Sequence, residues 1–142
     1  MAIDLTKIKK VFFVGIGGIG ISAIARMMLA SGKEVLGSDI SESALIDDFK
    51  KLGVKIQFGQ GIEFIPQNID LVVYSIAIPK YDPAFFKKLQ SLKIPIRSYP
   101  EMLGLVTKDK YTIAISGTHG KTTTTAMIAK ILVDDGKAEM VE

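Results

Sequence analysis

Two glycine-rich segments of this chain have residue types that bind phosphate groups. The first, here called the glycine loop, is residues 15–20 (GIGGIG), directly after the apolar run Val11–Val14. The second, the lysine loop, is residues 117–123 (GTHGKTT), directly after Thr112–Ile115. Each follows an expected strand and precedes an expected helix, a junction where backbone N–H groups and the helix dipole attract an anion. The sequence therefore predicts two phosphorylated ligands, one at each loop.

The glycine loop has the spacing of a dinucleotide-binding turn. Gly15 permits a tight turn, Gly17 permits a diphosphate to approach the backbone, and Gly20 permits close packing of the helix on the sheet. Asp39 ends the expected second strand, about 20 residues further on, where nicotinamide enzymes carry a ribose-binding carboxylate. That carboxylate also suits any other ribose or a base N–H, or a purely local turn. Ser22, in the first helical turn, is a candidate phosphate ligand.

The lysine loop matches the end of a Walker A loop. Lys121 has the position that reaches the β- and γ-phosphates, and the Thr122 hydroxyl has the position that ligates Mg²⁺. Ile115 stands where the common form has glycine, so the loop is a shorter variant. His119 is the single histidine of the chain, which excludes a multi-histidine metal site. We expect His119 to position or contact a nucleotide rather than act as a general base.

The composition excludes several classes of protein. With 142 residues, 48% of them hydrophobic and 23% charged, the chain is typical of a globular protein. No apolar run approaches the roughly 20 residues of a membrane span, and the first ten residues lack the apolar core of a signal peptide. The absence of cysteine excludes disulfides, and the cytoplasm is the expected compartment. The net charge of +3 comes from scattered lysines, which predicts no nucleic-acid-binding face.

The elements expected around the two loops alternate between strand and helix. The expected strands are Lys9–Val14, Glu34–Gly37, Val54–Phe58, Asp70–Ser75, Ile94–Arg97 and Thr112–Ile115. The expected helices are Ile19–Ala30, residues 42–52 after a cap at Ser41, residues 83–92 after a cap at Asp82, Pro100–Val106, and Lys121–Asp135. This order predicts an α/β fold with a Rossmann-like parallel sheet and helices on both faces, followed by a strand–P-loop–helix unit.

Several strings of this chain together resemble the Mur ligase family, the amino-acid-adding ligases of peptidoglycan synthesis. They are GIGGIGIS at 15–22, GSD at 37–39, SIAI at 75–78, EML at 101–103 and, above all, SGTHGKTTT at 116–124. The resemblance covers about residues 8–137. The histidine in the last string is typical of the branch that joins L-alanine to UDP-N-acetylmuramate. The murein-peptide recycling ligases are the relatives most easily confused with that branch.

The resemblance implies a division of the chain and a reaction. Residues 1–107 would be the Rossmann-like UDP-substrate-binding domain. Residues 108–142 would be the opening strand, P-loop and helix of a truncated central ATP-binding domain. In the family, ATP with Mg²⁺ phosphorylates the muramate carboxyl to an acyl phosphate, and the amine of L-alanine then displaces phosphate. We expect the full-length protein to be this ligase and the present chain alone to be inactive.

The resemblance also assigns residues to the two sites. Lys121 would be catalytic because its charge offsets that of the transferring phosphoryl group. The ATP-binding residues would be Gly117, Thr118, His119, Gly120, Lys121, Thr122 and Thr123, with Thr122 on Mg²⁺. The residues that bind the UDP substrate would be Gly15, Gly17, Gly18, Ile19, Gly20, Ser22, Asp39 and Ser75.

Two departures from the family pattern leave alternatives open. Members often carry a Gly-His or Asn-His pair after the third strand, whereas this chain has Gly59-Gln60, an uncharged residue that weakens the contact with the substrate diphosphate. Residues 138–142 do not resemble the family's continuation. The alternatives are a fragment of a murein-peptide recycling ligase and a non-catalytic nucleotide-sugar-binding module. A nicotinamide oxidoreductase fragment fits the glycine loop but not the lysine loop.

Residues 111–135 combine an apolar segment and a helix with an apolar face. An unpaired apolar strand exposes backbone donors and acceptors that pair readily with another chain. We therefore expect these residues to join two copies of the chain in a homodimer or to be poorly ordered.

Overall fold

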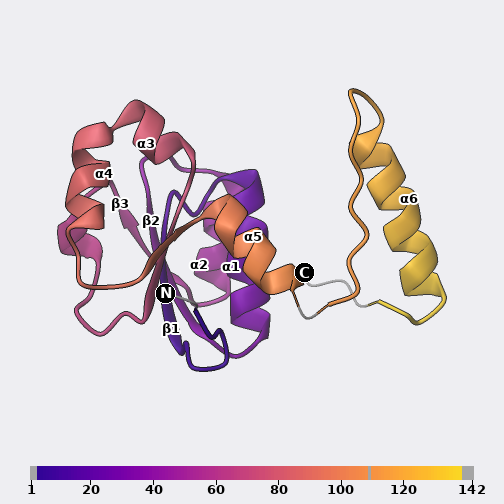
Figure 1. Cartoon of the computed structure of the whole chain (residues 1–142), viewed down its shortest axis with the longest axis horizontal. Coiled ribbons are helices and arrows are strands. Elements are labelled where there is room, and N and C mark those ends of the chain that lie inside the picture. Colours follow the sequence, from indigo (N-terminus) through magenta and orange to yellow (C-terminus); the bar gives the residue numbers. More distant parts are fainter. Residues whose placement is uncertain (1–2, 109, 139–142) are drawn as a thin grey trace. The chain divides into compact units, whose positions relative to one another are not determined.

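The chain is divided into two compact units, shown in Figure 1. The structure is a computed structural model that describes residues 3–108 and 110–138. Unit 1 is Met1–Val106 and unit 2 is Thr107–Glu142. None of the helices in the described residues is long and apolar enough to span a membrane.

Unit 1 is built on a parallel sheet of five strands. The strands are β1 (Lys10–Val14), β2 (Glu34–Asp39), β3 (Lys55–Phe58), β4 (Leu71–Tyr74) and β5 (Ile96–Ser98). Their order is β3-β2-β1-β4-β5, and every neighbouring pair is parallel. Val14 is in register with Ser38 of β2 and Tyr74 of β4, so these strands end level with one another. The predicted Rossmann-like sheet is confirmed, with β5 at an edge.

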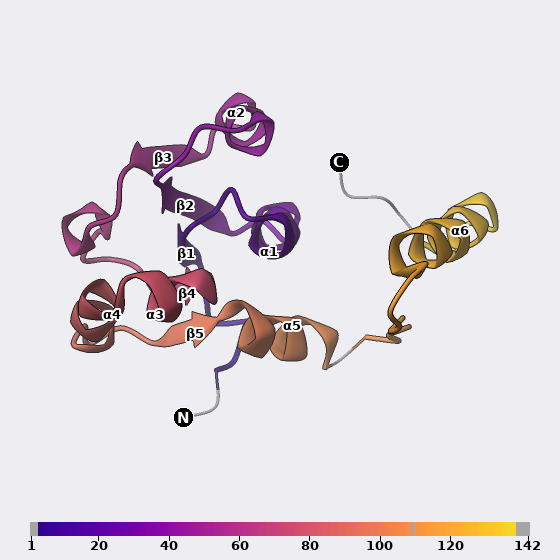
Figure 2. The ribbon, with the colours of Figure 1, turned by 90° about the horizontal axis from the view of Figure 1, so that it is seen from above.

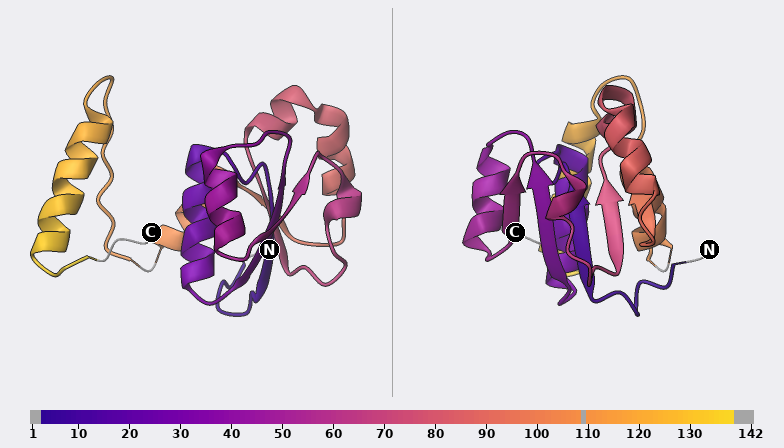
Figure 3. Two further views of the ribbon diagram at one scale, coloured as in Figure 1. Left: turned by 180° about the vertical axis from the view of Figure 1, so that it is seen from behind. Right: turned by 90° about the vertical axis from the view of Figure 1, so that its left-hand side faces the viewer.

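Helices cover both faces of this sheet (Figure 2 and Figure 3). The helices on one face are α1 (Ile19–Ala30), α2 (Ala44–Lys51) and α5 (Tyr99–Thr107). On the other face lie the 3₁₀ turn η1 (Ile62–Phe64), α3 (Ala77–Tyr81) and α4 (Pro83–Gln90). The parallel strands therefore alternate with helices, as the order of apolar patterns predicts.

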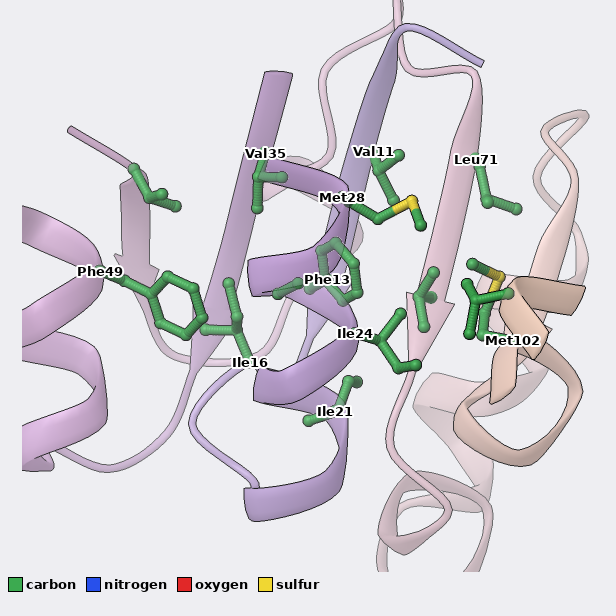
Figure 4. Close-up of a cluster of buried hydrophobic side chains, with 14 of the residues drawn as sticks. Val11, Phe13, Ile16, Ile21, Ile24, Met28, Val35, Phe49, Leu71 and Met102 are labelled. Atoms are coloured by element: carbon green, nitrogen blue, oxygen red, sulfur yellow. The ribbon is translucent and has the colours of Figure 1, made fainter. Parts of the chain in front are cut away.

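The core consists of two layers separated by the sheet. Val11 and Phe13 of β1 point into the layer formed with α1, α2 and α5 (Figure 4). Phe12 and Val14 point into the opposite layer, formed with α3 and α4. All four side chains are at most 1% exposed. Because successive side chains of a strand point to opposite faces, burial of both faces explains why β1 is a continuous apolar run. The buried strand fixes the position at which the glycine loop begins.

Helix caps in unit 1 agree with the sequence in one place and differ in another. Asp82 is the N-cap of α4, as predicted, and its Oδ1 accepts a hydrogen bond of 2.9 Å from the Phe85 N–H. The cap expected at Ser41 is wrong: α2 is capped by Ser43, whose Oγ accepts from the Ile46 N–H at 3.3 Å. Both serines suit a cap, and the later one has the spacing that puts the apolar face of α2 on the core.

Unit 2 consists of an extended segment, the lysine loop and one helix, α6 (Lys121–Asp134). The predicted helix is confirmed, but the predicted strand Thr112–Ile115 is wrong. The described residues of unit 2 contain no strand, and residues 111–117 have no regular secondary structure. A strand is defined by hydrogen bonds to a partner strand, and no partner for residues 112–115 is present among the described residues.

Candidate nucleotide-binding site

The candidate site of unit 1 is a cavity of about 330 Å³ at the edge of the sheet where the strands end. It is lined by Gly15 after β1, Asp39 at the end of β2, Gly59 and Gln60 after β3, and Ser75 after β4. Gly59 and Ser75 are fixed to neighbouring strand ends, since the Gly59 N–H donates to the Asp39 carbonyl and the Ser75 N–H to the Val14 carbonyl. Open parallel sheets bind their ligands at this edge, where the strand order reverses.

The glycine loop is a turn that is hydrogen-bonded to β2. Gly15 has a φ of +78°, a value that side-chain-bearing residues rarely adopt. Its N–H and that of Ile16 both donate to the Ser38 carbonyl, at 2.8 and 3.2 Å. The Gly18 N–H returns to the Gly15 carbonyl at 3.2 Å. The turn is therefore held by hydrogen bonds within the protein.

The Asp39 carboxylate accepts hydrogen bonds from the backbone of this turn and of the loop after β2. Its Oδ2 accepts a hydrogen bond of 2.8 Å from the Gly17 N–H, and its Oδ1 accepts one of 3.0 Å from the Ser41 N–H. A Cβ atom on Gly17 would lie 3.0 Å from Asp39 Oδ2 and 3.2 Å from Ile46 Cδ1. Glycine at position 17 is thus explained by the approach of Asp39 and α2. The diphosphate contact expected at Gly17 remains a prediction.

The first turn of α1 supplies the features that suit an anion. Gly18 is the N-cap, and no side chain caps the helix. The first N–H groups of a helix have no partner within it and lie at the positive end of its dipole. Gly17 and Gly18 line the cavity, so this end of α1 is the part of the site best suited to a diphosphate.

Three of the residues expected to bind the UDP substrate do not line the cavity. Ser22 is only 4% exposed, and its hydroxyl donates to the Ile19 carbonyl at 2.8 Å. Gly20 is required by packing, because a Cβ there would lie 2.7 Å from the Tyr99 ring. The Ile19 side chain is 87% exposed. Ser41 and Ser43, which were not predicted to belong to the site, also line the cavity. Their position directly after Asp39 could have indicated this.

The lysine loop of unit 2 is exposed along its whole length. Gly117 and Gly120 have positive φ values of +151° and +79°, and Gly120 is the N-cap of α6 without a side-chain cap. Lys121 Nζ donates to the Gly117 carbonyl at 2.7 Å, so its charge lies over the loop. The described residues include no group of three or more His, Cys, Asp or Glu that could hold a metal ion. The assignment of the Thr122 hydroxyl to Mg²⁺ stays a prediction.

Comparison with known proteins decides the family. A family model described as "Mur ligase family, catalytic domain" matches residues 10–111. The chain belongs to the Mur ligase family. This confirms the resemblance drawn from the glycine and lysine loops.

The relatives of this Mur ligase chain are much longer than the chain itself. It is 44% identical over 135 residues to a UDP-N-acetylmuramate–L-alanine ligase of Clostridium kluyveri, covering 94% of the chain and 29% of the relative. The crystal structure of the ligase of that name from Thermotoga maritima is 34% identical with a TM-score of 0.78, covering 91% of this chain and 30% of that one. A murein peptide ligase from Psychrobacter arcticus is 31% identical with a TM-score of 0.81, covering 90% of this chain and 27% of that one. The chain thus spans under a third of the length of these relatives.

Proposed function

We propose that this chain is the UDP-N-acetylmuramate-binding part of an ATP-dependent ligase that joins L-alanine to UDP-N-acetylmuramate in peptidoglycan synthesis. The observation that carries the proposal is the cavity at the strand ends, lined by Gly15, Gly17, Gly18, Asp39 and Ser75. It lies in a chain that is 44% identical to a ligase named for that reaction. The uncapped start of α1 is the proposed diphosphate site, and Asp39 the proposed acceptor for ribose.

The lysine loop is the proposed ATP site. Bound ATP would transfer its γ-phosphoryl group to the muramate carboxylate and leave as ADP, with Mg²⁺ offsetting the charge, and the amine of L-alanine would displace phosphate from the activated carboxyl. Lys121 Nζ, which bonds to the Gly117 carbonyl, would turn to the bound nucleotide and neutralise charge on the transferring phosphoryl group. Residues 117–123 would bind the nucleotide through backbone N–H groups, and the Thr122 hydroxyl would ligate Mg²⁺.

Unit 2 also carries an apolar surface that we propose to be covered by another protein surface. Tyr111, Ile113, Ile115, Ile128 and Leu132 line a hollow between the extended segment and α6. None of the described residues of α6 is buried. For the chain on its own, the proposed partner is a second copy. We also propose that the chain alone binds its UDP substrate without ligating it, since unit 2 offers no acidic cluster for Mg²⁺ among its described residues.

A murein peptide ligase is the second candidate, favoured by the TM-score of 0.81 to the Psychrobacter arcticus structure. A related structure from Neisseria meningitidis is named a ligase of UDP-N-acetylmuramate with a tripeptide. The two candidates share the UDP-sugar and differ in the amine that is joined to it. The cavity of unit 1 is therefore expected to serve either reaction.

Calorimetric titration with UDP-N-acetylmuramate, UDP and NADH tests the proposal. We expect both uridine nucleotides to bind and NADH to bind far more weakly. Tighter binding of NADH would overturn the proposal, because it would make the cavity a nicotinamide site. Gly104→Ala is a matched control for glycine substitutions in the loop, since a Cβ on Gly104 would meet no atom within 4 Å.

A further inference from the structure

Gln60 lines the cavity, and it also lines a second hollow together with Asp82, the N-cap of α4. Its side-chain Nε2 donates a hydrogen bond of 2.9 Å to Asp82 Oδ2. Asp82 is fixed in turn, because its Oδ1 accepts the Phe85 N–H as the cap of α4. The orientation of the Gln60 amide is thus set by a helix cap 22 residues away in the sequence.

The contact with Asp82 uses one N–H of the Gln60 amide, which leaves the carbonyl Oε1 as the acceptor of this side chain. A carboxylate only accepts hydrogen bonds, so the amide must turn its NH₂ group toward Asp82. The carbonyl Oε1 lies on the other side of the amide. Within residues 3–108 and 110–138, the bond to Asp82 is the hydrogen bond found for the Gln60 side chain. Oε1 cannot bond to a phosphate oxygen, which is itself an acceptor, and the negative charge of Asp82 disfavours a diphosphate beside the second N–H of the amide.

We propose that Gln60, oriented by Asp82, is a specificity-determining residue whose Oε1 accepts a hydrogen bond from an uncharged donor group of the bound UDP-sugar. The donor is a sugar hydroxyl or an amide N–H, and the diphosphate is bound elsewhere, at the start of α1. The inference rests on the proposed function, since it assumes that this cavity takes a UDP-sugar. In this proposal Gln60 accepts a hydrogen bond from the ligand, whereas a histidine that binds phosphate at this position would donate one.

Asp82→Asn tests the proposal by inverting the amide. Asparagine caps a helix as well as aspartate does, so its Oδ1 keeps the Phe85 N–H. Its NH₂ group then faces Gln60, which turns Oε1 toward position 82 and NH₂ toward the ligand. A donor then meets a donor, and we expect UDP-N-acetylmuramate to bind about tenfold more weakly.

The direction of the change in affinity distinguishes the proposal from an effect of the Asp82 charge alone. Removing a negative charge near an anionic ligand would tighten binding, and so would an NH₂ group turned toward the diphosphate. Unchanged or tighter binding by Asp82→Asn would therefore overturn the proposal. Gln60→Ala gives a second measurement that leaves the cap intact: it should weaken binding several-fold, and an unchanged Kd would also overturn the proposal. In the Gln60→Ala background, Asp82→Asn should cause no further weakening.

Three ligands identify the donor and keep this inference distinct from the proposed function. Weakening already seen with UMP would place the donor on the nucleoside, whereas weakening confined to UDP-N-acetylmuramate would place it on the sugar. Weakening seen with UDP and UDP-N-acetylmuramate but not with UMP would show that the contact needs the second phosphate to be present. If the unaltered protein binds none of the three, the proposed function itself fails. If it binds them and the variants do not weaken binding, only the role of Gln60 fails.

Discussion

The glycine loop and the lysine loop are similar in sequence but differ in what supports them. The glycine loop follows β1, whose side chains are buried on both faces of a sheet, and its turn is tied to Ser38 and Asp39. The lysine loop follows residues that form no strand among those described, and it is exposed throughout. Both loops have residue types that suit phosphate, but among the described residues the glycine loop is the one hydrogen-bonded to a neighbouring strand.

The two loops also differ in how they provide positive charge. The glycine loop has no cationic side chain and depends on helix N–H groups, with Asp39 adjacent. The lysine loop carries Lys121, whose ammonium bonds to the Gly117 carbonyl of its own loop. The first arrangement suits stable binding of a ligand that does not react at its phosphates. The second suits a phosphate whose charge changes during reaction, because a lysine can move to it.

Lys121→Ala should have the largest effect and should separate the two loops most clearly. In the proposed full-length ligase we expect turnover to fall by about two to three orders of magnitude, as for other losses of charge stabilisation. In the present chain, the Kd for UDP should stay within about twofold, because the binding free energy comes from the other loop. Steady-state kinetics and calorimetry provide the two measurements. A large loss of UDP binding would show that the lysine loop contributes to the UDP site.

The elements with a strong periodic pattern could be predicted from the sequence. β1 and α1 were predictable because burial on both faces gives a continuous apolar run and a helix on a sheet gives a helical stripe. α3 and η1 were not, since they span only five and three residues and α3 contains Pro79. The predicted strand at 112–115 failed because a strand needs a partner, which a local apolar pattern does not specify.

The candidate site could be predicted where local chain geometry determines it. Gly15 needs its positive φ and Asp39 ends a strand, and both line the cavity. The inward turn of Ser22 was not predictable, since a serine in a first helical turn bonds equally well to a ligand or to the preceding carbonyl. The contact between Gln60 and Asp82 depends on where the N-cap of α4 lies relative to the residues that follow β3, which no local pattern encodes.

Gly17→Val should disrupt the glycine loop through its protein contacts. A Cβ would crowd Asp39 Oδ2 and the Ile46 side chain, so we expect a loss of about 2 kcal/mol of unfolding free energy, as in overpacked sites. UDP binding should weaken more than tenfold, because Asp39 no longer holds the turn. Denaturant unfolding and calorimetry, with Gly104→Ala as control, measure both. Normal stability with lost binding would instead indicate that glycine is needed only for ligand approach.

The exposed surface of unit 2 predicts self-association that unit 1 should not show. Tyr111 is 97% exposed, Ile131 64% and Met127 61%, so burial against a second copy would remove apolar area from water. We expect the chain to sediment as a dimer and a version ending at Lys108 as a monomer. Ile131→Lys should shift the first toward monomer. Monomers throughout, with residues 111–135 protected from hydrogen exchange, would contradict a dimer.

Asp70→Asn should give the smallest effect and should act on unit 1 alone. Asp70 Oδ2 accepts hydrogen bonds of 2.8 Å from the N–H groups of Lys9 and Lys10, which ties the start of β1 to the start of β4. These two bonds hold the pKa of Asp70 below its ordinary value of 3.8. A carboxyl whose pKa is lowered by folding stabilises the protein above its ordinary pKa, and this stabilisation is lost as the pH falls through the lowered value.

The variant should therefore be less stable at neutral pH by about 1 kcal/mol, the net scale of a typical hydrogen bond in a folded protein. The difference should shrink below pH 3.8, because protonated aspartate and asparagine make equivalent bonds. Asp47→Asn is the control, since Asp47 is exposed and its pairing with Lys50 is long, at 3.9 Å. Urea unfolding at several pH values measures the difference. Equal stability of Asp70→Asn and the unaltered chain at neutral pH would show that the buried core alone, without this surface carboxylate, sets the position of β1 and of the glycine loop that follows it.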